Sequence, residues 1–182
     1  SVHKGRVIGY SEMDGIFHIS FEKSILEQQY IRLEDVPVGA VVNCEIEKLV
    51  IKEDGVAGLI LKVAEGINGF VPERHMSDIR LQHPEKKFRE GMKVKARVLS
   101  TNPAKRTMRL TLKKTLVNSD APPIKSYSEV SVGMQVPGTI VKLQPNGAHI
   151  KFYGALRGFL PVSEMSEAYI RDPNEHFRVG QV

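Results

Sequence analysis

The segment Gly69-Phe70-Val71-Pro72 begins a ten-residue stretch, residues 69–78. A similar stretch begins 89 residues later with Gly158-Phe159-Leu160-Pro161. Further matches follow at the same spacing, where Pro84, Phe88, Arg89 and Gly91 return as Pro173, Phe177, Arg178 and Gly180. A period of about 90 residues is too long for one solenoid repeat and suits a small domain repeated in tandem. The sequence therefore predicts one complete unit and parts of two others.

Apolar and polar residues alternate in several short segments, which is the pattern of half-buried strands. In the complete unit we expect an irregular crossover at 76–90 and strands over 38–52, 56–63, 69–72, 93–101 and 107–113. Five short strands with a crossover between the third and the fourth form the layout of an oligonucleotide/oligosaccharide-binding (OB) barrel. We therefore expect an all-β chain of tandem five-stranded OB-fold barrels with short helical connectors.

The repeat also suggests where the units begin and end. We expect residues 1–33 to be the closing hairpin and connector of a preceding unit, and 36–116 to be the complete unit. Residues 117–131 then form a linker stiffened by Pro122-Pro123, and 132–182 supply the first three strands of a following unit. Partial units leave strand edges unpaired, so we expect the two halves to complement each other within or between chains, or to be disordered, unless neighbouring sequence completes them.

Composition argues against several classes of protein. Apolar runs are too short for a transmembrane helix, and the single cysteine, Cys44, excludes an internal disulfide or a cysteine-based zinc site. Cys44 lies in an alternating run and is interpreted as a buried or half-buried strand residue. The histidines have no metal-ligand spacing, and no phosphate-binding loop, nucleophile elbow or carboxylate cluster is present. We therefore expect no enzymatic activity, no metal and no cofactor.

The net charge of +5 is unevenly distributed. Residues 34–79 contain four basic and nine acidic groups, whereas 80–114 contain twelve basic and two acidic groups. Alternation predicts an outward basic face on two paired strands and their turn, made of Lys93, Lys95, Arg97, Lys105, Arg106, Arg109 and Lys113. We interpret this face as a phosphate-contacting surface, with an ordinary solvated exterior as the alternative. The next unit is charge-balanced, so Lys142 and Lys151 are expected to contribute little.

Several glycines and the repeated segment carry a resemblance to a known family. The residues concerned are Val38-Gly39, Gly55, Gly147, Gly69-Phe70-Val71-Pro72, Gly91, Gly180 and Arg109-Leu110-Thr111-Leu112-Lys113. Together they resemble the S1 RNA-binding domain. The phrase Glu34-Asp35-Val36-Pro37 and the proline at Pro72 further resemble the tandem-S1 proteins that process ribosomal RNA in eukaryotes. This resemblance implies RNA binding, a role in ribosomal RNA processing and pre-ribosome assembly, ribosome assembly factors as partners, and residence in the nucleolus of the nucleus.

The chain departs from the S1 pattern at the positions that usually stack on bases. Asp54 and Ala57 replace the aromatic residues around the second-strand glycine, and Pro72 replaces the usual histidine. In the next unit only His149 is left as a stacking candidate, while Phe70 and Phe159 are expected in the core. A protein-interaction scaffold of degenerate S1 repeats is therefore a second hypothesis. A third is an RNA-recruiting module of a ribonuclease or a translation factor.

Overall fold

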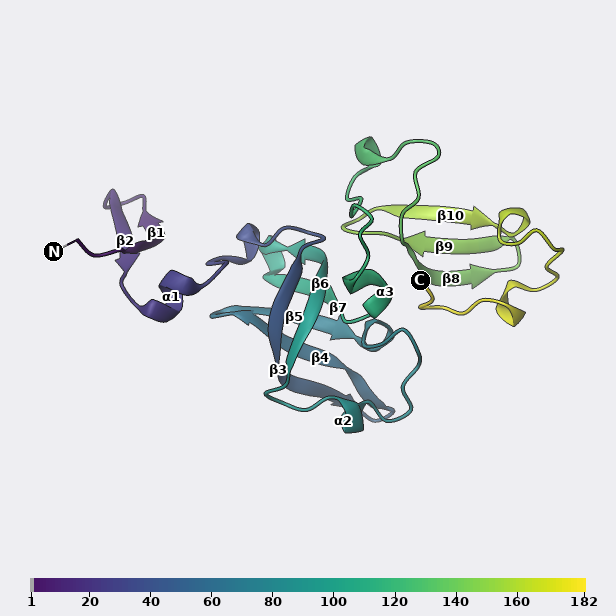
Figure 1. The fold of residues 1–182 in the computed structure, drawn as a ribbon, viewed down its shortest axis with the longest axis horizontal. Helices are drawn as coiled ribbons and strands as arrows, with labels where there is room; N and C mark the ends of the chain where they lie inside the picture. The colour runs from purple at the N-terminus through teal and green to yellow at the C-terminus, as the bar shows by residue number, and fades with distance from the viewer. Residues whose placement is uncertain (1) are drawn as a thin grey trace.

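The computed structural model describes residues 2–182, in which short helices and loops connect separate β-sheet regions (Figure 1). The N-terminal hairpin consists of β1 (Arg6–Ser11) and β2 (Ile16–Ser20). The five-stranded ring consists of β3 (Val41–Lys52), β4 (Gly55–Ala64), β5 (Ile67–Pro72), β6 (Lys93–Asn102) and β7 (Thr107–Thr111). The C-terminal sheet consists of β8 (Thr139–Gln144), β9 (Gly147–Lys151) and β10 (Arg157–Pro161).

The ring has the expected five strands and the expected crossover. Its strands are paired in the order β3-β4-β5-β7-β6, and β6 pairs back to β3. The crossover between β5 and β6 carries the 3-10 helix η2 (Glu73–His75) and the short helix α2 (Pro84–Lys87). The junction between β5 and β7 is the weakest, because only Phe70 and Arg109 pair there. The prediction of a mostly β chain is confirmed, but only one of the sheet regions has five strands.

Alternating residues of all five strands fill the interior of the ring. The buried side chains include Val42, Cys44, Ile46, Leu59, Leu61, Val71, Ala96, Val98, Met108 and Leu110. Phe88, from the crossover, is buried and belongs to this cluster. The prediction that Cys44 is a buried strand residue is confirmed.

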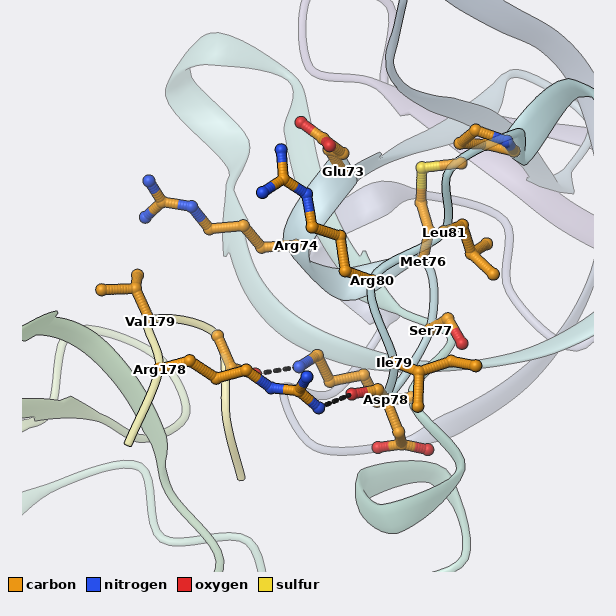
Figure 2. Close-up of a pocket in the computed structure, with 13 residues that line it drawn as sticks. Glu73, Arg74, Met76, Ser77, Asp78, Ile79, Arg80, Leu81, Arg178 and Val179 are labelled. Atoms are coloured by element: carbon orange, nitrogen blue, oxygen red, sulfur yellow. Dashed lines mark hydrogen bonds between the residues drawn. The ribbon is translucent and has the colours of Figure 1, made fainter. Parts of the chain in front are cut away.

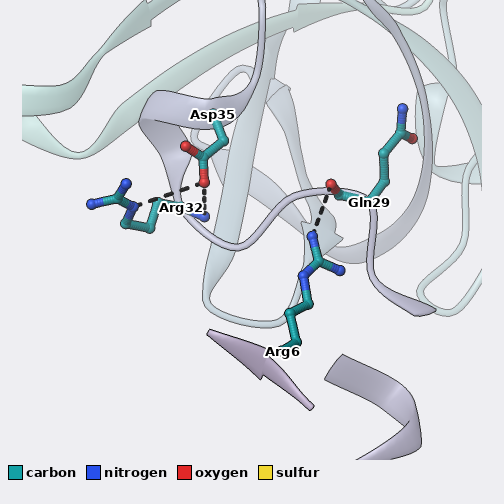
Figure 3. A network of polar contacts seen from close by, with 4 residues as sticks. All are labelled: Arg6, Gln29, Arg32 and Asp35. Atoms are coloured by element: carbon teal, nitrogen blue, oxygen red, sulfur yellow. Dashed lines mark hydrogen bonds and ion pairs between the residues drawn. The ribbon is translucent and has the colours of Figure 1, made fainter. Parts of the chain in front are cut away.

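The N-terminal hairpin stands away from the ring and is tied to its own connector. The guanidinium of Arg6 donates hydrogen bonds to the carbonyls of Ile25 (3.1 Å) and Gln28, in and just after helix α1 (Lys23–Glu27). It also donates to the Gln29 carbonyl at 3.3 Å (Figure 3). Beyond α1, the 3-10 helix η1 (Leu33–Asp35) is closed by the Asp35 carboxylate, which accepts from the Arg32 backbone N–H at 3.1 Å (Figure 3).

The connector also reaches the ring through apolar side chains. Tyr30 and Leu33, from the connector, pack against the ring core. The hairpin itself leaves Phe17 and Phe21 exposed, and within residues 2–182 its strands do not pair with the C-terminal sheet. The option that the two partial units complement each other within one chain is therefore wrong for this structure.

The C-terminal sheet and the N-terminal hairpin lie on opposite sides of the ring (Figure 1). The C-terminal unit contacts the ring directly. Helix α3 (Lys114–Val117) and a linker with the 3-10 helix η4 (Tyr127–Glu129) lead into this sheet. The Gly154 N–H donates to the Leu99 carbonyl of β6 at 2.7 Å, and the Lys113 ammonium donates to the Gly180 carbonyl. The remaining 3-10 helices are η3 (Pro103–Lys105), η5 (Val162–Glu164) and η6 (Pro173–Glu175).

Candidate nucleic-acid interface

Most of the predicted basic residues are exposed. Lys93 and Lys95 project from β6, and Arg109 projects from β7. Lys105 and Arg106 lie exposed in the turn between these strands, where Arg106 adopts a left-handed conformation with φ 49°. These five cations are therefore available to solvent, as expected.

Arg97 does not belong to that exposed surface. Its side chain is only 7 % exposed because α3 and the following residues cross over β6. The guanidinium donates to the carbonyls of Gly39 (2.8 Å), Leu116 (2.8 Å) and Ser119 (3.0 Å). It also lies 5.5 Å from the ring centroid of Tyr153 in the following unit. The expectation of a solvent-exposed Arg97 is wrong, and the residue acts as a buried strut between units.

Lys113 is also buried, with 2 % of its surface exposed. Strand β7 ends at Thr111, so the alternation that predicted an outward Lys113 no longer applies two residues later. Burial lowers the pKa of the Lys113 ammonium, which donates to the Gly180 carbonyl. The expectation that Lys113 faces solvent is wrong, and phosphate contact by this residue is incompatible with its burial.

The remaining cations do not form one continuous face. Lys93 is paired across the sheet with Glu45, and Lys95 with Asn43. At the other end of β6 an irregularity between Val98 and Ser100 shifts the register, which places Arg109 opposite Ser100. Lys93 and Lys95 thus share a mixed-charge groove with β3, while Arg109 lies beside β5.

The side chain of Phe70 covers a glycine on the outside of the ring. Gly69 and Val71 are buried, so Phe70 points away from the core, and it is directly paired with Ile60 and with Arg109. A Cβ atom added at Gly58 would lie 2.5 Å from the Phe70 ring, which shows how closely the ring lies over that glycine. The expectation of a core Phe70 is therefore wrong. The buried residues on either side were the signal for its orientation.

Phe159 repeats this arrangement in the C-terminal sheet. Its ring is 48 % exposed, and a Cβ added at Gly147 would lie 2.8 Å from it. The exposed His149 packs edge-on against Phe159 with 5.4 Å between the ring centroids. His149 also approaches the side-chain oxygen of Gln144 at 2.9 Å. The predicted stacking residue His149 thus has an aromatic partner that the sequence reasoning assigned to the core.

Two cavities at the seam between the ring and the C-terminal unit are both lined by Glu73 and Arg74 of η2. The first, of about 450 Å³, is shown in Figure 2, where the side chains of Arg74, Arg80 and Arg178 surround it from both units. Arg178 donates to the Asp78 carbonyl at 3.3 Å, which ties the last residues of the chain to the crossover (Figure 2).

The second cavity, of about 360 Å³, lies between β7 and the strands β8 and β9. Arg109 lines it from the ring and Lys151 from the C-terminal sheet, and its apolar wall includes Phe152 and Tyr153. Burial lowers the pKa of Lys151, and the positive charge of Arg109 lowers it further. Sequence reasoning did not place Lys151 in a shared cavity, because a position facing a neighbouring unit gives no local signal.

His75 adds a titratable group to the same cavity. Its Nδ1 lies 3.0 Å from the Thr111 hydroxyl oxygen. Burial, together with the positive charges of Lys113, Lys151, Arg109 and Arg74, lowers the pKa of His75 to about 4. The imidazole is therefore neutral at physiological pH, and it can form a hydrogen bond with the Thr111 hydroxyl without adding charge to the cavity.

Comparison with known families identifies the chain. Residues 39–112 and 130–182, more than half of the sequence, match the model of the RRP5 S1 domain. The chain belongs to the RRP5 S1 domain family. The resemblance to S1 domains is thereby confirmed. The two matched ranges carry the ring with the crossover and the C-terminal sheet with the last residues of the chain.

Named proteins with similar sequences include long RRP5 chains. This S1 segment is 49 % identical over its full length to rRNA biogenesis protein rrp5 of Schizosaccharomyces pombe, and 41 % identical to Protein RRP5 homolog of Homo sapiens. It spans 10 % of the length of each of these relatives. Among solved structures, GSP13 from Bacillus subtilis is 18 % identical, with a TM-score of 0.39, and the match covers 53 % of this chain and 73 % of that one.

Proposed function

We propose that this RRP5 S1 segment binds single-stranded regions of pre-ribosomal RNA, as a non-catalytic part of a longer protein that serves ribosomal RNA processing and pre-ribosome assembly in the nucleolus. The observation that carries the proposal is the pairing of outward Phe70 with exposed Arg109 on adjacent strands. An aromatic face stacks on a base, and a neighbouring cation contacts the phosphate of the same strand. The name of the Schizosaccharomyces pombe relative, rRNA biogenesis protein rrp5, supports the choice of RNA.

Phosphate contact in this proposal comes from the exposed part of the predicted basic set. Lys105, Arg106 and Arg109 supply it at the turn between β6 and β7 and on β7, and Lys93 and Lys95 form a separate patch beside β3. Arg97 and Lys113 are excluded because their charged groups are buried against backbone carbonyls. His149 and Phe159 offer a second stacking position on the following unit.

A protein-interaction scaffold is the second candidate function. Asp54, Ala57 and Pro72 occupy positions where S1 domains that bind RNA well usually carry aromatic or histidine side chains, which favours partners other than RNA. Assembly factors of the ribosome are the partners this candidate implies. The orientation of Phe70 weighs against the scaffold as the main function, because a stacking ring is present on the same strand pair.

Titration of a fluorescent single-stranded RNA with the wild-type chain and with Phe70→Ala tests the proposal. Stacking on one aromatic residue is worth about 1–3 kcal/mol, so the variant should bind about 5- to 150-fold more weakly. Phe17→Ala is a matched control, since Phe17 is an exposed aromatic residue of the N-terminal hairpin. Equal affinities for wild type and Phe70→Ala would remove the stacking platform from the proposal and move the scaffold ahead.

A further inference from the structure

The second seam cavity has an excess of positive charge that residues 2–182 do not neutralise. Arg74, Arg109 and Lys151 line it, and Glu73 is the single carboxylate among its lining residues. None of these three cations forms an ion pair in the part of the chain that the structure describes, where the pairs involve other residues. Clustered cations in a partly enclosed space repel one another, and a bound anion would relieve that repulsion.

The two units contribute opposite walls of this cavity. Arg109 comes from β7 of the ring, whereas Lys151 ends strand β9 of the C-terminal sheet. Burial and the charge of Arg109 lower the pKa of Lys151, so holding this ammonium charged in the free protein has a free-energy cost. An anion placed between Arg109 and Lys151 would reverse that cost.

The cavity is also connected to further cations along the seam. Arg74 lines both seam cavities, and the first one adds Arg80 from the crossover and Arg178 from the end of the chain (Figure 2). A row of cations flanking two neighbouring cavities suits a polyanion that carries successive phosphates. The apolar wall formed by Phe152 and Tyr153 gives a base or ribose a surface to pack on.

We propose that the seam is an RNA-binding site in which one phosphate of a single strand lies between Arg109 and Lys151, so that the strand is held by two consecutive units at once. The site rests on the proposed function, since it assigns the path of the same RNA. It differs from a surface confined to one unit because both walls must be present. The geometry of the walls is fixed without RNA by the Gly154–Leu99 hydrogen bond and by Arg97 beneath Tyr153.

Binding of a fluorescent single-stranded RNA by the full chain, and by its Arg109→Gln, Lys151→Gln and double variants, tests this site. Each single change removes a hydrogen bond between a charged side chain and the phosphate, so it should weaken binding about tenfold. If both cations hold one phosphate, the double variant should lose far less than the product of the two single losses. The slope of log affinity against log salt should fall by about 0.7 in the double variant.

Lys52→Gln is the matched control, because Lys52 is exposed at the turn between β3 and β4 and lines neither seam cavity. A second measurement uses the wild-type chain and the acetylation of its lysines with and without RNA. RNA should abolish most of the acetylation at Lys151 and leave that at Lys52 unchanged. This readout does not depend on how well a variant folds.

Three outcomes would overturn the proposal in distinguishable ways. If Lys151→Gln binds RNA with the wild-type affinity, and RNA does not protect Lys151 from acetylation, the seam site is refuted and the proposed function stands. Independent, multiplicative losses would show that Arg109 and Lys151 do not share a phosphate. Binding of an acidic poly-glutamate peptide, with no binding of RNA at any salt concentration, would refute the seam site and the proposed function together.

Discussion

Replacing the buried Arg97 by methionine tests whether this residue is a strut or an RNA contact. The change keeps an unbranched side chain but removes three hydrogen bonds, to the carbonyls of Gly39, Leu116 and Ser119. Hydrogen bonds to charged groups contribute about 1.5–3 kcal/mol each, so three of them amount to roughly 4.5–9 kcal/mol. Removing the desolvation penalty of a buried guanidinium offsets several kcal/mol of that loss. We expect a net destabilisation of about 2–4 kcal/mol.

Urea unfolding measures this change directly. With a slope of about 1–3 kcal/mol per molar urea, the midpoint should fall by roughly 1–2 M. Lys95→Met is the control on the same strand, and its exposed side chain should change stability by no more than about 0.5 kcal/mol. Under conditions without urea in which both variants are folded, Arg97→Met should retain the wild-type salt dependence of RNA binding. Equal stabilities of the two variants, or a flattened salt slope in Arg97→Met, would refute the strut.

Three further predictions concern single residues in or around the ring. Gly58→Ala should destabilise the ring by about 2 kcal/mol or more, seen as a lower Tm, because its Cβ would lie 2.4 Å from the Val71 carbonyl oxygen; a Tm equal to that of wild type would contradict the close approach. Burial raises the pKa of the Cys44 thiol to about 12, so a thiol reagent at pH 8 should modify it only after urea is added, and rapid modification without urea would contradict its burial. The pKa of His75 is held at about 4 against about 6.5 unfolded, so the unfolded chain takes up the proton first as the pH falls. Stability should therefore drop from pH 6.5 to pH 4 by up to about 3 kcal/mol in wild type and by less in His75→Gln, as measured by urea unfolding at each pH.

Alternation within single strands was enough to predict the interior of the ring and part of its exterior. Val42, Cys44 and Ile46 are buried, and Lys93 and Lys95 are exposed, because each of these orientations is determined by the pleat of one strand. The unit length and the crossover followed from the repeat in the same way. These features depend on residues close in sequence, so a single sequence contains the information that they need.

Contacts between units were beyond the reach of that reasoning. Arg97 points outward from β6 as alternation predicts, but α3 and the linker bury it, and no pattern within the strand indicates this cover. Lys151 lies in a charge-balanced unit, and the cavity that it shares with Arg109 is formed only where the two units meet. Phe70 was a different kind of error, because strand alternation places it on the face opposite to Gly69 and Val71, and these two residues are the buried ones. The RNA-contacting roles of the exposed residues and the domain limits stay predictions.

The junction between β5 and β7 has the fewest paired positions in the ring, so we expect the ring to open there first. Separating these strands breaks one paired position, whereas separating β3 from β4 breaks seven. Both residues of that one position, Phe70 and Arg109, belong to the proposed RNA surface. A strand of RNA lying across them would hold β5 and β7 together and raise the free energy of local opening. Amide exchange in these two strands would then slow on binding, because the bound RNA would bridge the strand junction that the protein itself pairs at one position.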